Sequence, residues 1–123
     1  MEQKIDKNGI KISSTIKKIL VRFKKNHLEL SVNYQLIKSL DPDKSRANKI
    51  TNQFMYCSFN LHSPINPVLH HFHMESPDLL KKLAHLLRKK FESTQFQKIR
   101  EDKKKLFEHT ITTLEKISLD ESV

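Results

Sequence analysis

Two segments of this sequence carry lysines and arginines at spacings that suit contact with phosphate groups. Residues 17–25 hold five cations and no acid, and residues 79–91 also hold five cations and no acid. A solvated helix usually places Glu four residues from Lys, since each such pair adds roughly 0.2–0.5 kcal/mol. The lack of these pairs indicates that an external polyanion supplies the compensating charge. The residues predicted to bind it are Lys17, Lys18, Arg22, Lys24, Lys25, Lys81, Lys82, Arg88 and Lys89.

The overall composition agrees with a polyanionic partner. The chain has 23 Lys and Arg against 14 Asp and Glu, a net charge of +9. Phosphate contact with release of counterions would give binding that falls steeply with salt. Nucleic acid is the first candidate and an anionic membrane surface the second, and composition alone does not separate RNA, DNA and lipid.

Other chemistries have less support in the sequence. Gly9 is the only glycine, which argues against Gly-rich loops that cradle nucleotide phosphates. Cys57 lies in an apolar run and is expected to be a small core residue rather than an activated thiolate. Because no pair of carboxylates stands out either, we expect a protein that is not an enzyme and uses no cofactor.

The histidines are the only group that could bind a metal. If residues 68–75 form a strand, His71, His73 and Glu75 share one face, and His62 lies opposite on the preceding strand. No cysteine accompanies them and their spacing matches no zinc pattern. We therefore predict no metal site and interpret these side chains as a half-exposed sheet edge or an RNA-facing surface.

Aromatic side chains offer a second way to bind nucleic acid. Phe54, Tyr56, Phe59 and Phe72 could stack on bases if they are exposed, as on the sheets of proteins that bind single-stranded RNA. With seven Phe and no Trp in the chain, most of these rings are needed for the core.

The first half of the chain predicts one helix between strands. A short strand is expected at 9–13, followed by a helix through 25 that begins at Ser13 or Ser14. Its apolar face would consist of Ile16, Ile19, Leu20 and Phe23, although Ile19, Val21 and Phe23 also fit a strand. Strict alternation over 28–36 predicts a strand, and the aromatic run 53–62 predicts another.

The second half is predicted to be mainly helical. Residues 68–74 fit either a third strand or one helical turn after Pro67. Ser76, Pro77 and Asp78 then form a helix start before a leucine stripe over 79–91. Another helical pattern covers about 96–117. The expected order is β-α-β-β-β-α plus a C-terminal helical extension, an α+β fold with helices on one face of a small, mostly antiparallel sheet. We place a basic α+β RNA-binding domain at 1–95 and the extension, with a frayed acidic end, at 96–123.

This pattern resembles a known family over about residues 8–100. The segments that carry the resemblance are 9–18, 60–64, 69–75 and the leucine-lined basic run 79–90. They are similar to the short ribosome hibernation-promoting factors, also called ribosome-associated inhibitors or sigma-54 modulation proteins. The resemblance implies the β-α-β-β-β-α fold and a non-enzymatic protein that occupies the decoding channel of the small ribosomal subunit. It implies ribosomal RNA as the partner of the nine cations named above, with translation inhibited.

The remaining expectations concern partners and location. The polar N-terminus and the absence of a long apolar run predict a cytoplasmic protein that does not insert into membranes. The alternative function is a protein-interaction module, such as a small secretion chaperone or adaptor. Its mark would be a homodimer through 96–118 that buries Ile99, Leu106, Ile111 and Leu114.

Overall fold

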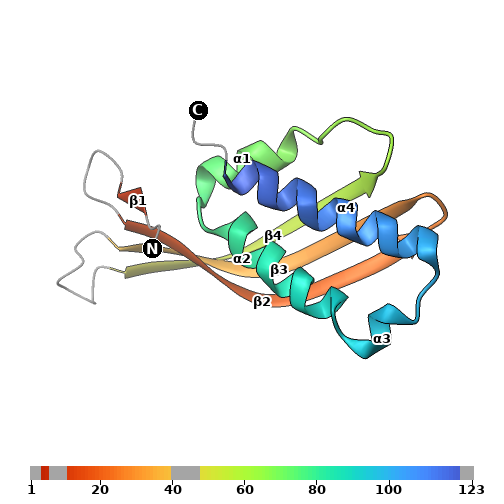
Figure 1. Cartoon of the computed structure of the whole chain (residues 1–123). Helices are drawn as coiled ribbons and strands as arrows, with labels where there is room; N and C mark the ends of the chain where they lie inside the picture. The colour runs from red at the N-terminus through yellow and green to blue at the C-terminus, as the bar shows by residue number, and fades with distance from the viewer. Residues whose placement is uncertain (1–3, 6–10, 40–47, 120–123) are drawn as a thin grey trace.

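A computed structural model describes residues 4–5, 11–39 and 48–119. The short strand β1 (Lys4–Ile5) and three long strands, β2 (Lys11–Lys24), β3 (His27–Ser39) and β4 (Asn48–Asn60), form one antiparallel sheet in the order β1-β2-β3-β4. The helices α1 (Val68–Glu75), α2 (Leu79–Phe91), α3 (Thr94–Gln97) and α4 (Glu101–Ser118) follow. They lie on one side of the sheet (Figure 1). The predicted α+β class, with an antiparallel sheet and helices on one face, is confirmed.

The predicted order of elements is wrong at the first helix. Residues 13–25 continue β2 and its turn, and the rival interpretation of Ile19, Val21 and Phe23 as strand residues is correct. The register shifts between Ile16 and Lys18, so Lys17 is an extra residue in β2. This bulge places both Ile16 and Ile19 against the core although they are three residues apart. A spacing of three is typical of a helix, which explains the error.

The next two strands follow their sequence patterns. In β3 the alternating side chains Leu28, Leu30, Val32, Tyr34 and Leu36 are buried, as predicted. In β4 the buried side chains are Met55, Cys57 and Phe59, and they lie opposite Val32, Leu30 and Leu28. One face of the sheet, the inner face, therefore carries the apolar side chains of both strands.

Residues 68–75 form a helix, so the strand interpretation of this segment is wrong. Pro67 precedes α1, where its fixed φ suits a helix start. The Asn66 Oδ1 accepts a hydrogen bond from the Val68 amide at 3.0 Å, where the chain enters the helix.

Helices α2 and α4 pack against each other and against the inner face. One core cluster contains strand residues such as Leu30, α2 residues such as Leu83, and α4 residues such as Phe107. The core thus includes side chains from both sides of the boundary predicted at residue 95. Leu106, Ile111 and Leu114, which the alternative function would bury in a homodimer, are buried within the chain itself, and Ile99 is half-buried.

A polar cluster fixes the start of α2 against β2. The Asp78 carboxylate accepts hydrogen bonds from the Ser14 hydroxyl at 2.8 Å and from the Ser14 amide at 3.2 Å. The Ser76 hydroxyl donates to the same carboxylate at 3.2 Å, and Lys82 Nζ lies 2.9 Å from it. Lys82 Nζ also donates to the Ser14 carbonyl.

Candidate nucleic-acid interface

The face of the sheet turned away from the helices is not covered by any element among the described residues. We call it the open face and define it by the outward side chains of the three long strands. These include Lys18, Leu20, Arg22 and Lys24 of β2, His27, Glu29, Ser31, Asn33 and Gln35 of β3, and Asn52, Phe54, Tyr56 and Ser58 of β4.

The β4 side of the open face carries two aromatic rings. Phe54 is 57% exposed and Tyr56 is 48% exposed. They are two residues apart on one strand, so they point to the same side with about 7 Å between their Cα atoms. Such a pair can stack on two successive unpaired bases.

The β2 side of the open face carries cations. The side chains of Lys18, Arg22 and Lys24 are exposed and alternate with exposed Leu20. Because β2 and β4 flank β3 at strand spacings near 4.8 Å, the cations and the rings lie roughly 10 Å apart across the sheet. Cations and aromatic rings at this separation could contact the phosphates and the bases of one extended strand.

The register joins these side chains into rows across the sheet. Lys18 lies opposite Asn33, and Asn33 lies opposite Phe54. In the next row, Leu20, Ser31 and Tyr56 are neighbours in the same way. The central strand therefore presents amides and hydroxyls, which donate and accept hydrogen bonds, between the cations and the rings.

Glu29 is the only carboxylate on the open face as defined by these residues. A hydrogen bond from the Tyr56 hydroxyl is the main reason why the pKa of Glu29 is below its ordinary value, and Lys24 and His27 lower it further. The same hydrogen bond raises the pKa of Tyr56. Glu29 also lies 4.0 Å from Lys24 Nζ and 3.6 Å from His27 Nε2. Lys24 therefore lies close enough to offset the negative charge of Glu29. The hydrogen bond to Glu29 fixes the hydroxyl end of the Tyr56 side chain.

The nine predicted cations do not form one surface. Lys18, Arg22 and Lys24 lie on the open face, and exposed Lys17 sits at the bulge. Lys25 occupies the turn between β2 and β3 with a φ of 41°, in the region that favours glycine. The other four residues belong to α2, in the helix layer on the opposite side of the sheet (Figure 1).

Lys82 and Arg88 of α2 are paired with acids of the chain itself. Lys82 contacts Asp78, and Arg88 lies 3.1 Å from Glu115 and 3.6 Å from Glu108, both on α4. The premise that these cations lack compensating carboxylates therefore does not hold for Lys82 and Arg88. Glu108 and Glu115 follow Arg88 by 20 or more residues, so the pairing depends on how α4 packs on α2.

The histidines do not assemble as a metal site would require. His71 is exposed on α1, His73 is buried with its Nδ1 lacking a hydrogen-bond partner, and His62 lies in the turn after β4. Among the described residues no three His, Cys, Asp or Glu are grouped closely enough to hold a metal ion.

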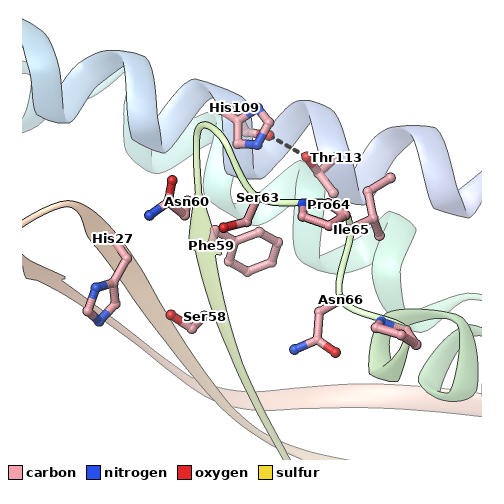
Figure 2. A pocket seen from close by; sticks show the side chains of 11 residues that line it. His27, Ser58, Phe59, Asn60, Ser63, Pro64, Ile65, Asn66, His109 and Thr113 are labelled. Atoms are coloured by element: carbon pink, nitrogen blue, oxygen red, sulfur yellow. Dashed lines mark hydrogen bonds between the residues drawn. The ribbon is translucent and has the colours of Figure 1, made fainter.

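A hollow with a volume of about 430 Å³ lies between the end of β4, the segment 61–67 and α4. Figure 2 shows the side chains that line it. His27 and His109 lie on different sides of it and do not point toward each other. The Oδ1 atoms of Asn60 and Asn66 already accept hydrogen bonds from the backbone amides of His62 and Val68. These side chains stabilise the loop.

The remaining candidate residues serve the core. Cys57 is buried as predicted, and burial raises the pKa of its thiol to about 11. Phe59 is buried and Phe72 packs against the core, so neither of these two predicted stacking residues can reach a base. Sequence reasoning missed Leu20, Asn33 and Gln35, which the pattern of exposed alternate residues in β2 and β3 could have indicated.

Comparison with protein-family models, curated protein sequences and solved structures finds no match to this chain. None of the described helices is long and apolar enough to span a membrane.

Proposed function

We propose that this protein binds single-stranded RNA on the open face of its sheet and does so without catalysis. The observation that carries the proposal is the exposed pair Phe54 and Tyr56 on an uncovered sheet face, with Lys18, Arg22 and Lys24 on the strand across from it. Aromatic rings at this spacing suit stacked bases, and cations beside them suit the backbone.

The chemistry of the central strand supports RNA as the ligand. Asn33 and Gln35 lie between the cations and the rings, and their amides can donate to and accept from base edges and 2′-hydroxyls. Double-stranded RNA suits this face less well, because its bases are stacked on each other and cannot stack on Phe54 and Tyr56.

Removing the two rings tests the proposal. We expect the double variant F54A/Y56A to bind a fluorescent U-rich RNA about 10- to 100-fold more weakly, since each base–aromatic stack contributes roughly 1–3 kcal/mol. Fluorescence anisotropy at low salt measures the affinity, and the same oligonucleotide as DNA tests the contribution of the 2′-hydroxyls.

Two variants serve as controls. Y56F keeps the ring and should retain most of the affinity. L86A removes an apolar side chain that is 41% exposed on α2, in the helix layer, and should leave the affinity unchanged. Wild-type protein that binds none of the oligonucleotides, or F54A/Y56A that binds as tightly as wild type, would refute the proposal.

Ribosomal RNA and the inhibition of translation stay predictions of the family resemblance. The first helix expected from that family is a strand here, and the proposal for the open face does not depend on it. Binding through the α2 cations also stays a prediction, and the test above keeps it separate because those residues are unchanged in F54A/Y56A.

A further inference from the structure

Among the described residues the sheet ends at β4, and no strand there pairs with the outer edge of β4. β4 is the last strand in the order β1-β2-β3-β4 and pairs only with β3 in the part of the chain that the structure describes. Its 13 residues follow β3 from Asn48 to Asn60 without a shift in register. A straight edge of this length presents a row of backbone N–H and C=O groups to another chain.

The opposite edge of the same sheet carries the devices that prevent such pairing. β2 has the bulge at Lys17 and exposed lysines at 17, 18 and 24, and β1 covers its beginning. Bulges, lysines and short covering strands are known means of blocking edge-to-edge association. The two edges of the sheet therefore differ in how well they are protected against pairing with another chain. β4 is the edge that stays open to such pairing.

The composition of β4 agrees with this difference. Lys49 is the only charged residue among the 13 of β4, and residues 50–60, ITNQFMYCSFN, contain no charge, proline or glycine, although the chain as a whole carries a net charge of +9. Ile50, Phe54 and Tyr56 on this strand are all exposed. A neutral strip is where two copies of a strongly cationic chain can approach each other with the least repulsion.

We infer that β4 pairs in antiparallel fashion with β4 of a second copy, so that the protein is a two-fold symmetric dimer with one continuous sheet. Pairing centred on Phe54, the middle residue of β4, uses all 13 residues. It places Asn52 opposite Tyr56 of the partner subunit. Because the side-chain period of a strand is two, outward residues stay outward and the buried residues of both copies stay on the helix side.

The dimer goes beyond the proposed function and does not rest on it. Its sheet would have the order β1-β2-β3-β4-β4-β3-β2-β1, with the rings of both copies at the centre and the β2 cations on both flanks. An RNA-binding monomer and a dimer that binds no RNA are both conceivable, so the two ideas fail separately.

The mass in solution tests the inference. Light scattering coupled to size exclusion, on nuclease-treated protein at tens of micromolar, should give about 29 kDa, twice the 14.5 kDa of one chain. We expect N52K/S58K to be monomeric, because the added charges of one copy would lie diagonally next to those of its partner. S13K/T15K adds the same charge to the β2 edge and should stay dimeric.

A disulfide cross-link tests the proposed β4–β4 register directly, and it does so in a protein that is still a dimer. With Cys57 replaced by Ser, F54C should form an intermolecular disulfide on mild oxidation, because residue 54 faces its own copy in the proposed register. L20C, exposed on β2 near the other edge, should not. A monomeric wild type, a dimer that N52K/S58K leaves intact, or equal cross-linking at both positions would overturn the inference.

Discussion

Single residues on the open face are held in place by partners that the sequence does not reveal. The Tyr56 hydroxyl is hydrogen-bonded to Glu29, which also lies 4.0 Å from Lys24 Nζ and 3.6 Å from His27 Nε2. A tyrosine fixed at its edge loses less conformational freedom when a base stacks on it, and this favours binding. Phe54 has no such tether and is the more exposed of the two rings.

The pKa of Asp78 also depends on hydrogen-bond partners within the fold. Its shift leads to a prediction about stability. Burial tends to raise the pKa of Asp78, but hydrogen bonds from Lys82 and Ser14 outweigh it and hold the pKa below the ordinary 3.8. Since the folded state favours the carboxylate, this contribution to stability is present above pH 3.8 and is lost as the pH falls through the lowered pKa.

We expect D78N to lower the free energy of unfolding by about 2 kcal/mol at pH 7, because charge-assisted hydrogen bonds to Ser14, Ser76 and Lys82 are lost. Urea denaturation at pH 7 and at pH 3 measures the difference, which should shrink at the lower pH. E108Q is a suitable control, since Glu108 is exposed and its contact with Arg88 is long. An equal deficit of D78N at both pH values would contradict this account.

At the level of elements, the bulge in β2 explains both the error in the sequence prediction and the position of the cations. Ile16 pairs with Tyr34 and Lys18 pairs with Asn33, so Lys17 has no partner of its own on β3. If Lys17 were absent, the strand would be regular at this point. The extra residue changes the parity of the strand, so that Ile16 is inward before it while Ile19, Val21 and Phe23 are inward after it.

Deletion of single residues from β2 tests this parity. We expect deletion of Lys17 to leave the fold intact with a free energy of unfolding within roughly 1 kcal/mol of wild type, because every inward side chain keeps its face. Deletion of Leu20 should destabilise by several times as much, because either Val21 and Phe23 turn outward, or the bulge closes and Ile19 turns outward while Lys18 turns inward. Urea midpoints compare the two, and equal losses would show that the bulge does not set the register.

The elements whose patterns are regular could be predicted from the sequence. Strict alternation identified β3, the Ser76-Pro77-Asp78 start identified α2, and apolar spacing indicated α4. The bulged strand could not be recognised, because a spacing of three between Ile16 and Ile19 is also that of a helix. Phe54, Arg22 and Lys18 were each named as candidates, but their placement on one face depends on the pairing of β2, β3 and β4. That register is set by contacts between strands and is not readable from any one of them.

At the scale of the whole molecule, the two layers divide the cations into separate surfaces. The helix layer carries Lys89 and Lys116, both exposed, and the open face carries Lys18 and Arg22 on the other side of the sheet. A net charge of +9 attracts any polyanion from a distance, whereas contacts with phosphates require cations at the binding face. Two double variants that reverse charges on different surfaces can therefore distinguish long-range attraction of RNA from direct phosphate contacts at one face.

K18E/R22E and K89E/K116E each change the net charge by four, from +9 to +5. If RNA lies on the open face, K18E/R22E should weaken binding strongly and should reduce the slope of log affinity against log salt by roughly 1.4, since each phosphate contact on a single strand contributes about 0.7. K89E/K116E should weaken binding slightly at low salt and leave the slope unchanged, because it alters only the distant field. Anisotropy titrations over a series of salt concentrations give both slopes. Equal slopes for the two variants would mean that the protein binds RNA through its net charge, and a larger effect of K89E/K116E would place the RNA on the helix layer.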